Sequence, residues 1–354
     1  MTKVNWLIYG ANGYTGQLVA EEALHRGHRP ILAGRSKEKI EPIADRTGLE
    51  YVVADPADPG SFKKALSGVG LIFNAAGPFI HTSTPIIKAC LEYGIHYTDI
   101  TGEIPVFQNI FSYDSQAKQK GIVLMPGIGF DVIPTDCLAL YVAERVPGAV
   151  ELELAFAGLS HISPGTMKTM VEMIPGGGIV RRDGRLISYP LGRGAKKVRF
   201  PDGEHTVIPI LWGDLETAYH STGVKNITTS MAYPDFMIPF LPAGISIMQK
   251  LFASKTIQRL AQKMIGMTVK GPGKDERETV RSYVWARAAD AQGNEKQAWL
   301  DIPETYLFTA VASVMTIEKI FELRPKGALT PAMAFGSDFV LNINGVKHYD
   351  KLPG

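Results

Sequence analysis

The segment GANGYTG, residues 10–16, is the first part of the sequence whose residue types and spacing suggest chemistry. Glycines let a backbone approach a bulky anion, because they carry no side chain. The apolar run 4–9 before the segment suits a buried strand, and residues 17–26 after it show helical spacing. A glycine turn between a strand and a helix offers N–H groups to a pyrophosphate. We therefore predict dinucleotide binding by Gly10, Asn12, Gly13, Tyr14, Thr15 and Gly16.

Strand-like and helix-like segments alternate from this turn to residue 125. Further strands are predicted at 30–33, 51–54, 69–76, 96–100 and 122–125, and further helices at 37–47, 61–66, 85–92 and 106–120. This alternation with short connections predicts βαβ units and a doubly wound parallel sheet, so the fold class is α/β. In that context a glycine turn without a ligand is the weaker interpretation.

The end of the second predicted strand distinguishes NAD from NADP sites. An acid there binds the NAD ribose, whereas an arginine accepts the 2′-phosphate of NADP. The segment ILAGRSKEK places Arg35 and Ser36 at this point and no acid at the strand end. A guanidinium can donate two parallel hydrogen bonds to a phosphate. We predict NADP as the cofactor, with a solvated surface arginine as the alternative for Arg35.

Other predicted strand ends should line the same crevice, since ligands bind beyond the carboxyl ends of parallel strands. Asp55 follows the third strand, where it can contact the adenine amine or cap the next helix, and both readings stay open. The fourth strand ends in NAAGPF, whose small residues suit a passing ribose and pyrophosphate. The cofactor residues predicted there are Asn74, Ala75, Ala76, Gly77 and Pro78.

Two segments contain candidate catalytic residues. HYTDITGE places Tyr97 and Asp99 on one face of a strand, with helix capping by Thr101 or Glu103 as the alternative role for the segment. Asp131, in GIGFDVIPTD, follows the sixth strand, which lies on the nicotinamide half of a doubly wound sheet. We favour Asp131 over Asp99 as the acid at the reaction centre, and a turn aspartate is the alternative.

Several stretches together resemble the saccharopine dehydrogenase-like oxidoreductases, including the bacterial branch with the trans-acting enoyl reductases. They are GANGYTGQLVAEEALHRG, ILAGRS, NAAGPF, HYTDITGE, PGIGFDVIPTDCLA, SPGTMKTMVEMIPGGGIVRRDGRLISYPLG and LTPAMAFG. The resemblance covers most of the chain and implies that the segment like PGIGFD carries an aspartate near the substrate. Extended short-chain dehydrogenases share the glycine turn but need Tyr-x-x-x-Lys, and no tyrosine here has a lysine four residues later.

The same resemblance implies a domain organisation. We expect a Rossmann NADP-binding domain over residues 1–135 and a second α+β domain with a largely antiparallel sheet over 136–303. A C-terminal helix and tail, residues 304–354, should return to the Rossmann domain. A chain of 354 residues is long for a single hydrophobic core, which agrees with two domains.

The composition excludes several other classes of protein. With 37 Lys and Arg against 35 Asp and Glu, the chain shows no footprint of nucleic-acid binding. Its two cysteines, Cys90 and Cys137, lack metal-ligand spacing, so we expect a reducing compartment and no metal site. The N-terminal residues show no signal-peptide pattern. We expect a cytoplasmic homodimer that acts on a small-molecule substrate.

Residues 236–252 form an apolar stretch that carries no charge from Phe236 to Gln249. The stretch is shorter than the ~20 apolar residues of a membrane-spanning helix, and Pro239, Pro242 and Gly244 interrupt it. We expect it to pack in the second domain or across a dimer, with peripheral membrane contact as the alternative.

The function predicted from these features is NADP-dependent hydride transfer to or from a small or acyl-type substrate, such as an enoyl C=C or an imine C=N bond. The nicotinamide would supply the hydride chemistry, and the protein would orient it. The alternative is a non-catalytic or membrane-associated protein with a regulatory or vestigial nucleotide site.

Overall fold

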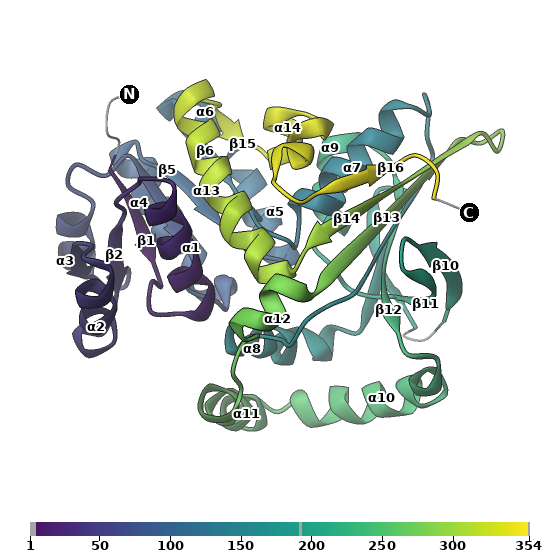
Figure 1. The fold of residues 1–354 in the computed structure, drawn as a ribbon, viewed down its shortest axis with the longest axis horizontal. Coiled ribbons are helices and arrows are strands. Elements are labelled where there is room, and N and C mark those ends of the chain that lie inside the picture. The colour runs from purple at the N-terminus through teal and green to yellow at the C-terminus, as the bar shows by residue number, and fades with distance from the viewer. Residues whose placement is uncertain (1–4, 191–192, 353–354) are drawn as a thin grey trace. The chain divides into compact units, whose positions relative to one another are not determined.

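The computed structural model describes residues 5–190 and 193–352, which belong to two compact units (Figure 1). Unit 1 comprises Met1–Phe130 and Tyr306–Ala334, and unit 2 comprises Asp131–Thr305 and Phe335–Gly354. The sequence predicts boundaries at 135 and 303, whereas the chain passes between the units after Phe130, Thr305 and Ala334.

Unit 1 is built on a seven-stranded parallel sheet in the order β15-β6-β5-β4-β1-β2-β3, which confirms the predicted doubly wound fold. Its strands are β1 (Trp6–Tyr9), β2 (Ile31–Gly34), β3 (Tyr51–Val53), β4 (Leu71–Asn74), β5 (His96–Asp99), β6 (Val123–Met125) and β15 (Gly327–Ala328). Its helices are α1 (Tyr14–His25), α2 (Lys37–Thr47), α3 (Pro59–Ala65), α4 (Phe79–Tyr93), α5 (Ile104–Ser112), α6 (Asp114–Lys120), α13 (Thr305–Leu323) and α14 (Pro331–Phe335). The strand order reverses between β1 and β4, the place where doubly wound sheets bind ligands.

Two helices of unit 1 differ from the sequence prediction. The helix predicted from Pro85 begins six residues earlier, at Phe79, and Pro85 lies inside it. The helix predicted over 106–120 is two helices, because α5 ends at Ser112 and α6 begins at Asp114. The two-residue strand β15 was not predicted, since it is too short to show a periodic pattern.

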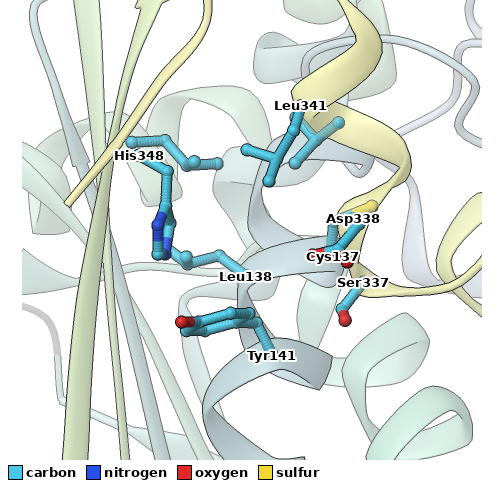
Figure 2. A pocket seen from close by; sticks show the side chains of 9 residues that line it. Cys137, Leu138, Tyr141, Ser337, Asp338, Leu341 and His348 are labelled. Atoms are coloured by element: carbon cyan, nitrogen blue, oxygen red, sulfur yellow. The ribbon is translucent and has the colours of Figure 1, made fainter. Parts of the chain in front are cut away.

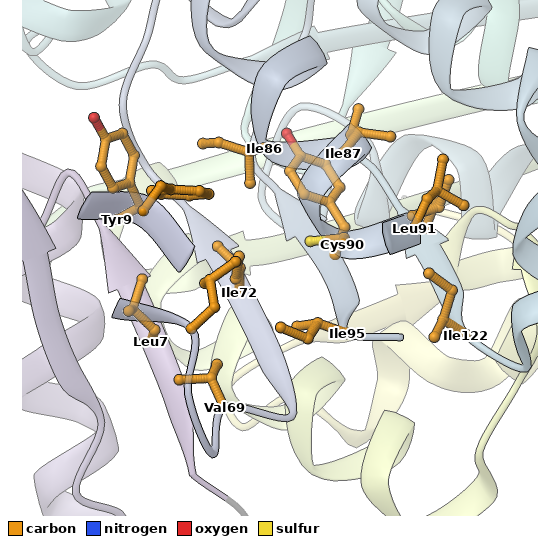
Figure 3. Packing of buried hydrophobic residues seen from close by; sticks show 14 of the residues in the cluster. Leu7, Tyr9, Val69, Ile72, Ile86, Ile87, Cys90, Leu91, Ile95 and Ile122 are labelled. Atoms are coloured by element: carbon orange, nitrogen blue, oxygen red, sulfur yellow. The ribbon is translucent and has the colours of Figure 1, made fainter. Parts of the chain in front are cut away.

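The core that holds α4 on the sheet is shown in Figure 3. Buried side chains of alternate strand residues, such as Leu7 and Ile72, belong to one cluster with Ile86 and Cys90 of α4. Burial raises the pKa of the Cys90 thiol, so this cysteine acts as a small apolar side chain. The packing fixes the position of the turn that joins β4 to α4.

Unit 2 contains a nine-stranded mixed sheet in the order β10-β11-β12-β7-β13-β14-β16, with β8 paired to β12 and β9 to β8. Its strands are β7 (Glu151–Ala157), β8 (Gly178–Arg182), β9 (Arg185–Tyr189), β10 (Lys196–Phe200), β11 (Gly203–Pro209), β12 (Asn226–Tyr233), β13 (Arg281–Ala289), β14 (Glu295–Pro303) and β16 (Lys347–Tyr349). Its helices are α7 (Ile133–Glu144), α8 (Pro164–Met173), α9 (Asp214–Thr222), α10 (Leu241–Phe252), α11 (Lys255–Thr268) and α12 (Lys274–Thr279), with 3-10 turns η1 (Ile174–Gly176), η2 (Asp235–Phe240) and η3 (Ser337–Asn342). The β12–β7 pair is parallel and the other strand pairs of this sheet in the described residues are antiparallel, which confirms the predicted α+β character.

The C-terminal segment differs from the prediction that it returns as a whole to the first domain. Residues 306–334 belong to unit 1, where β15 pairs with β6. The rest belongs to unit 2, because β16 adds to the edge of the second sheet by pairing with β14. Within the described residues, the structure contains no helix with the length and apolar character needed to span a membrane.

Candidate functional site

The turn between β1 and α1 is tight, and two of its three glycines are required by packing alone. Gly10 has a φ of +82°, and its N–H and that of Ala11 both donate to the carbonyl of Ala33, at 2.9 and 3.2 Å. A Cβ atom at Gly10 would lie 2.8 Å from the Ala76 nitrogen, and one at Gly16 would lie 2.5 Å from the Gly10 oxygen. The turn after β1 therefore lies directly against the turn after β4.

Of the three glycines in this turn, Gly13 is the one whose glycine identity is least explained by packing. It occupies the N-cap position of α1 with φ −73° and ψ 162°, an ordinary conformation for any capping residue. A Cβ atom there would meet the Gly10 oxygen at 3.2 Å, a contact that a small shift relieves. The usual N-cap residues bring a side-chain oxygen for the first N–H groups, and Gly13 brings none. The start of α1 is thus shaped to receive an anion.

The first N–H groups of α4 find their acceptor in a side chain of the protein. The buried carboxylate of Glu103 accepts hydrogen bonds from the N–H groups of Phe79 and Ile80, both at 2.8 Å. Glu103 also occupies the N-cap position of α5, but its side chain does not cap that helix, so the predicted alternative role of Glu103 is wrong. Because a protein carboxylate already fills the α4 position, α1 is the helix of the pair that can take a phosphate.

Arg35 and Ser36 follow β2, as predicted. Arg35 is exposed, and the Ser36 hydroxyl donates to Glu38 Oε2 at 2.7 Å. Burial raises the pKa of the Tyr9 phenol to about 12, while the charge of Arg35 lowers that pKa and the charge of Asp55 raises it. Arg35 and Asp55 are therefore electrostatic neighbours of one phenol at the carboxyl ends of the first strands.

Asp55 does not cap the helix after it, so that alternative is wrong. Its Oδ1 accepts a hydrogen bond from the Ala57 N–H at 3.0 Å within a turn. The cap of α3 is Asp58, whose Oδ1 accepts from the N–H groups of Gly60 and Ser61 at 3.0 and 3.4 Å. The half-buried Asp55 side chain keeps its second oxygen for another donor, and adenine contact stays a prediction.

The turn after β4 is shaped by Asn74. This buried side chain accepts from the Ala76 N–H at 3.0 Å and donates to the hydroxyls of Tyr97 and Thr82 at 3.2 and 3.3 Å. Its polar atoms are used inside the protein, so Asn74 positions the turn. The predicted residues Ala75, Ala76, Gly77 and Pro78 are exposed or half-buried, so cofactor contact by their backbone stays a prediction.

Asp99 and Tyr97 lie on the same face of β5 and form a fully buried network. Asp99 Oδ1 accepts from the N–H groups of Thr101 and Gly127 at 3.0 and 2.9 Å, and Oδ2 accepts from the Tyr97 hydroxyl at 2.8 Å. Burial raises the pKa of the Asp99 carboxyl to about 6, although these three hydrogen bonds oppose the rise. Burial also raises the pKa of Tyr97 well above its ordinary value. Because the Asp99 carboxylate accepts hydrogen bonds from the loop after β5 and from the loop after β6, it holds the two loops together.

The loop after β6 is fixed by α13. The Phe130 N–H donates to Thr309 Oγ1, and Ser313 Oγ donates to the Ile128 carbonyl, both at 3.0 Å. A Cβ atom at Gly129 would lie 2.8 Å from Thr309 Cγ2, so this glycine is required by packing against the helix. The loop therefore has one defined path as far as Phe130.

Asp131 directly follows this loop and is the first residue of unit 2. Its side chain is half-buried, and its carbonyl accepts a hydrogen bond from Trp212 Nε1 at 3.1 Å. One peptide bond joins Asp131 to Phe130, so its Cα atom lies about 3.8 Å from that of the fixed residue. The predicted role of its carboxylate in catalysis stays a prediction.

Sequence reasoning missed the contribution of α13 to the site. The ring of Tyr306 lies edge-on to the ring of Tyr14, with 5.1 Å between the ring centroids. Tyr14 begins α1, so this contact supports the start of the helix. No spacing pattern in the sequence connects Tyr14 with Tyr306, so only the structure shows that the two rings are in contact.

A small recess in unit 2 is shown in Figure 2. Its lining includes Cys137, Tyr141 and His348, and its cavity volume is about 10 Å³. That volume holds roughly one water molecule. Burial raises the pKa of Cys137 well above its ordinary value, so the thiol is unreactive there. The recess is too small for a substrate.

The glycine turn lies in a segment whose sequence matches a known protein family. Residues 6–125 match the model of the saccharopine dehydrogenase NADP-binding domain. This part of the chain is therefore similar to saccharopine dehydrogenase NADP-binding domains. It contains β1 to β6 with the turns described above, and the resemblance stated from the sequence is confirmed.

Two relatives with similar sequences are named as an oxidoreductase and a reductase. The saccharopine dehydrogenase-like oxidoreductase of Bos taurus is 26% identical over 269 residues, covering 69% of this chain and 58% of that protein. A trans-acting enoyl reductase of Mycobacterium ulcerans is 32% identical over 138 residues, covering 37% of this chain and 33% of that protein. The match to the mycobacterial protein thus spans about a third of its length, and the match to the bovine protein spans somewhat more than half.

A solved structure shows the same fold. Apo saccharopine dehydrogenase (L-Glu forming) from Saccharomyces cerevisiae matches with a TM-score of 0.62 and 13% sequence identity, covering 98% of this chain and 99% of that chain. At this identity the likeness concerns the fold alone. It agrees with a saccharopine dehydrogenase NADP-binding domain followed by a unit with a mixed sheet.

The buried Asp99 carboxyl should make stability depend on pH. Its folded pKa of about 6 lies above the ordinary 3.8, so its contribution to stability is full below about pH 4 and is lost as the pH rises through 6. The loss is about 3 kcal/mol, since one pKa unit is about 1.4 kcal/mol. Asp99→Asn removes this titration. In urea unfolding, the stability of the variant relative to the native chain should therefore rise by about 2 kcal/mol between pH 4 and 7, because part of the loss has already occurred at pH 4.

The control is Asp45→Asn, which changes an exposed carboxyl on α2. Its unfolding free energy should stay parallel to that of the native chain across the same pH range. A constant difference between Asp99→Asn and the native chain would show that Asp99 titrates normally in the folded state.

Proposed function

We propose that this chain is an NADP-dependent oxidoreductase that transfers a hydride to or from a small or acyl-type substrate with a C=C or C=N bond. The observation that carries the proposal is the glycine-capped start of α1 within an NADP-binding domain, together with Arg35 at the end of β2. The names of the relatives, a saccharopine dehydrogenase-like oxidoreductase and an enoyl reductase, support reduction of such bonds.

The residues present fit the dinucleotide along the whole crevice. The backbone from Gly10 to Gly16 would hold the pyrophosphate, because it offers N–H groups and the positive end of α1. Arg35 and Ser36 would hold the 2′-phosphate, and Asp55 would accept from the adenine amine. The backbone of residues 75–78 would lie beside the ribose. When bound, the cofactor supplies the hydride.

Asp131 is the acid that we propose for the reaction centre. Reduction of a C=C or C=N bond needs one proton in addition to the hydride. The loop before Asp131 belongs to the nicotinamide half of a doubly wound sheet, and α13 fixes it up to Phe130. Asp99 is buried and accepts three hydrogen bonds, so it suits a positioning role better than proton transfer.

Arg35→Ala should separate the two cofactors. Loss of a charged hydrogen-bond partner costs about 1.5–3 kcal/mol, so NADPH should bind about tenfold or more weakly while NADH binding stays the same. Fluorescence titration of both cofactors measures this. Lys39→Ala, which removes another exposed cation of the same segment, is the control and should leave both affinities unchanged. Equal losses for NADPH and NADH would remove Arg35 from the 2′-phosphate site.

Asp131→Asn should reduce turnover by on the order of a hundredfold while NADPH affinity and thermal stability are kept, since loss of general acid catalysis has this size. Steady-state oxidation of NADPH with a panel of enoyl and imine substrates is the measurement. Asp131→Glu, which keeps the carboxyl, should retain part of the turnover.

Unchanged turnover in Asp131→Asn would contradict this proposal and would show that Asp131 acts as a turn residue. If the native chain binds NADPH but none of the panel oxidises it, the regulatory alternative replaces the enzyme. A homodimer and a cytoplasmic location stay predictions.

A further inference from the structure

The surface made by η2, α10 and α11 of unit 2 is unusually apolar. The expectation that residues 236–252 pack inside the second domain is wrong for part of this segment, because Phe236 is 74% exposed and Ile247 is 67% exposed. The apolar stretch also continues beyond 252 into α11. Its exposed large apolar side chains are Phe236, Met237, Ile247, Met248, Leu251, Leu260, Met264 and Met267.

In α11 these side chains form one stripe. Leu260, Met264 and Met267 are four and three residues apart, so they lie on the same side of the helix. The opposite side is buried, and there the Gln262 side chain donates to Glu172 Oε1 of α8 at 2.8 Å. The helix is thus docked on unit 2 by its polar and mixed face, and its apolar stripe points outward.

The neighbouring helix α10 also presents apolar side chains to the outside. Ile247, Met248 and Leu251 are exposed, whereas a Cβ atom at Gly177 would lie 3.0 Å from the Gln249 side-chain amide. Gln249 therefore marks the face of α10 that lies against η1 and β8. The Gln258 side chain of α11 donates to the carbonyl at the end of α10, at 2.6 Å. Figure 1 shows the two helices as neighbours outside the sheet of unit 2.

The charged residues within the segment 236–274 all have one sign. From 236 to 274 the sequence contains no Asp or Glu, although acids nearly balance bases in the whole chain. The bases of the same segment are all exposed: Lys250, Lys255, Arg259, Lys263, Lys270 and Lys274. Helices with exposed apolar stripes and basic flanks are typical of proteins that lie in the interface of an anionic membrane.

We propose that α10 and α11 form a peripheral membrane-binding surface, with the apolar stripes inserted among the lipids and the basic residues at anionic headgroups. Contact with a second copy of the chain fits the same surface less well. In a symmetric dimer each patch meets its own copy, so two segments with only positive charge would face each other. The proposal does not depend on the nucleotide site or on the proposed reaction.

The test is co-sedimentation of the full chain with vesicles. Vesicles of phosphatidylcholine with one quarter phosphatidylglycerol should bind the protein, and pure phosphatidylcholine vesicles should bind it at least tenfold more weakly. Addition of salt should weaken the binding to anionic vesicles, because the headgroup attraction is screened. Equal partitioning into both kinds of vesicle, or into neither, would overturn the proposal.

Two variants test the parts of the surface separately. The double variant Leu260→Glu with Met264→Glu should abolish vesicle binding, since both side chains are exposed and both changes place a negative charge in the stripe. The double variant Arg259→Ser with Lys263→Ser should bind about thirtyfold more weakly, at about 1 kcal/mol for each charge near the surface. The control is Ile187→Glu, which changes an exposed apolar residue on β9 and should bind as the native chain does.

Unfolding midpoints check that the variants stay folded, and sedimentation velocity checks the competing occupant. If the native chain is a dimer that Leu260→Glu with Met264→Glu splits, and vesicles bind neither form, the surface is a contact between copies and the membrane proposal is overturned. A loss of binding in Ile187→Glu as large as that in the stripe variant would overturn it as well.

Discussion

The start of an α-helix needs acceptors for its first N–H groups, and the site in unit 1 is organised by how two neighbouring helices meet this need. For α4 the chain provides the Glu103 carboxylate, which accepts from the first two residues of the helix. For α1 it provides Gly13, which has no side chain in the cap position. Because β1 and β4 are adjacent where the strand order reverses, the two helix starts lie at the same edge of the sheet.

Buried polar side chains hold the loops at this edge in place. Asn74, Asp99 and Glu103 all accept hydrogen bonds from backbone N–H groups of turns that follow the central strands. A buried polar group is costly unless it is hydrogen-bonded, so each turn is held in the arrangement that satisfies its acceptor. The arrangement leaves the N-cap of α1 without a side chain at Gly13, and Arg35 after β2 is exposed.

Local patterns in the sequence predicted most elements of unit 1, because strand and helix periodicity depend on neighbouring residues. The helix at Lys37–Thr47 agrees to the residue, whereas the cap formed by Glu103 and the contacts of Tyr306 and Thr309 join distant segments and leave no local signal. The apolar stretch after Asp235 was predicted to be buried because composition does not report which face of a helix points outward. Only the structure shows that Phe236 and Ile247 of this stretch are exposed.

The account depends most on Gly13, and Gly13→Asp tests it directly. The backbone at this position has the conformation of an ordinary N-cap, so an aspartate would fit and cap α1 itself, stabilising the helix by a few tenths of a kcal/mol relative to glycine. Its carboxylate would occupy the place of the pyrophosphate and repel it. Calorimetric titration should show NADPH affinity lower by at least about a hundredfold in a variant whose unfolding temperature is kept or raised, on the scale of about 1.4 kcal/mol for each factor of ten. Unchanged NADPH affinity in a folded Gly13→Asp variant would contradict the account.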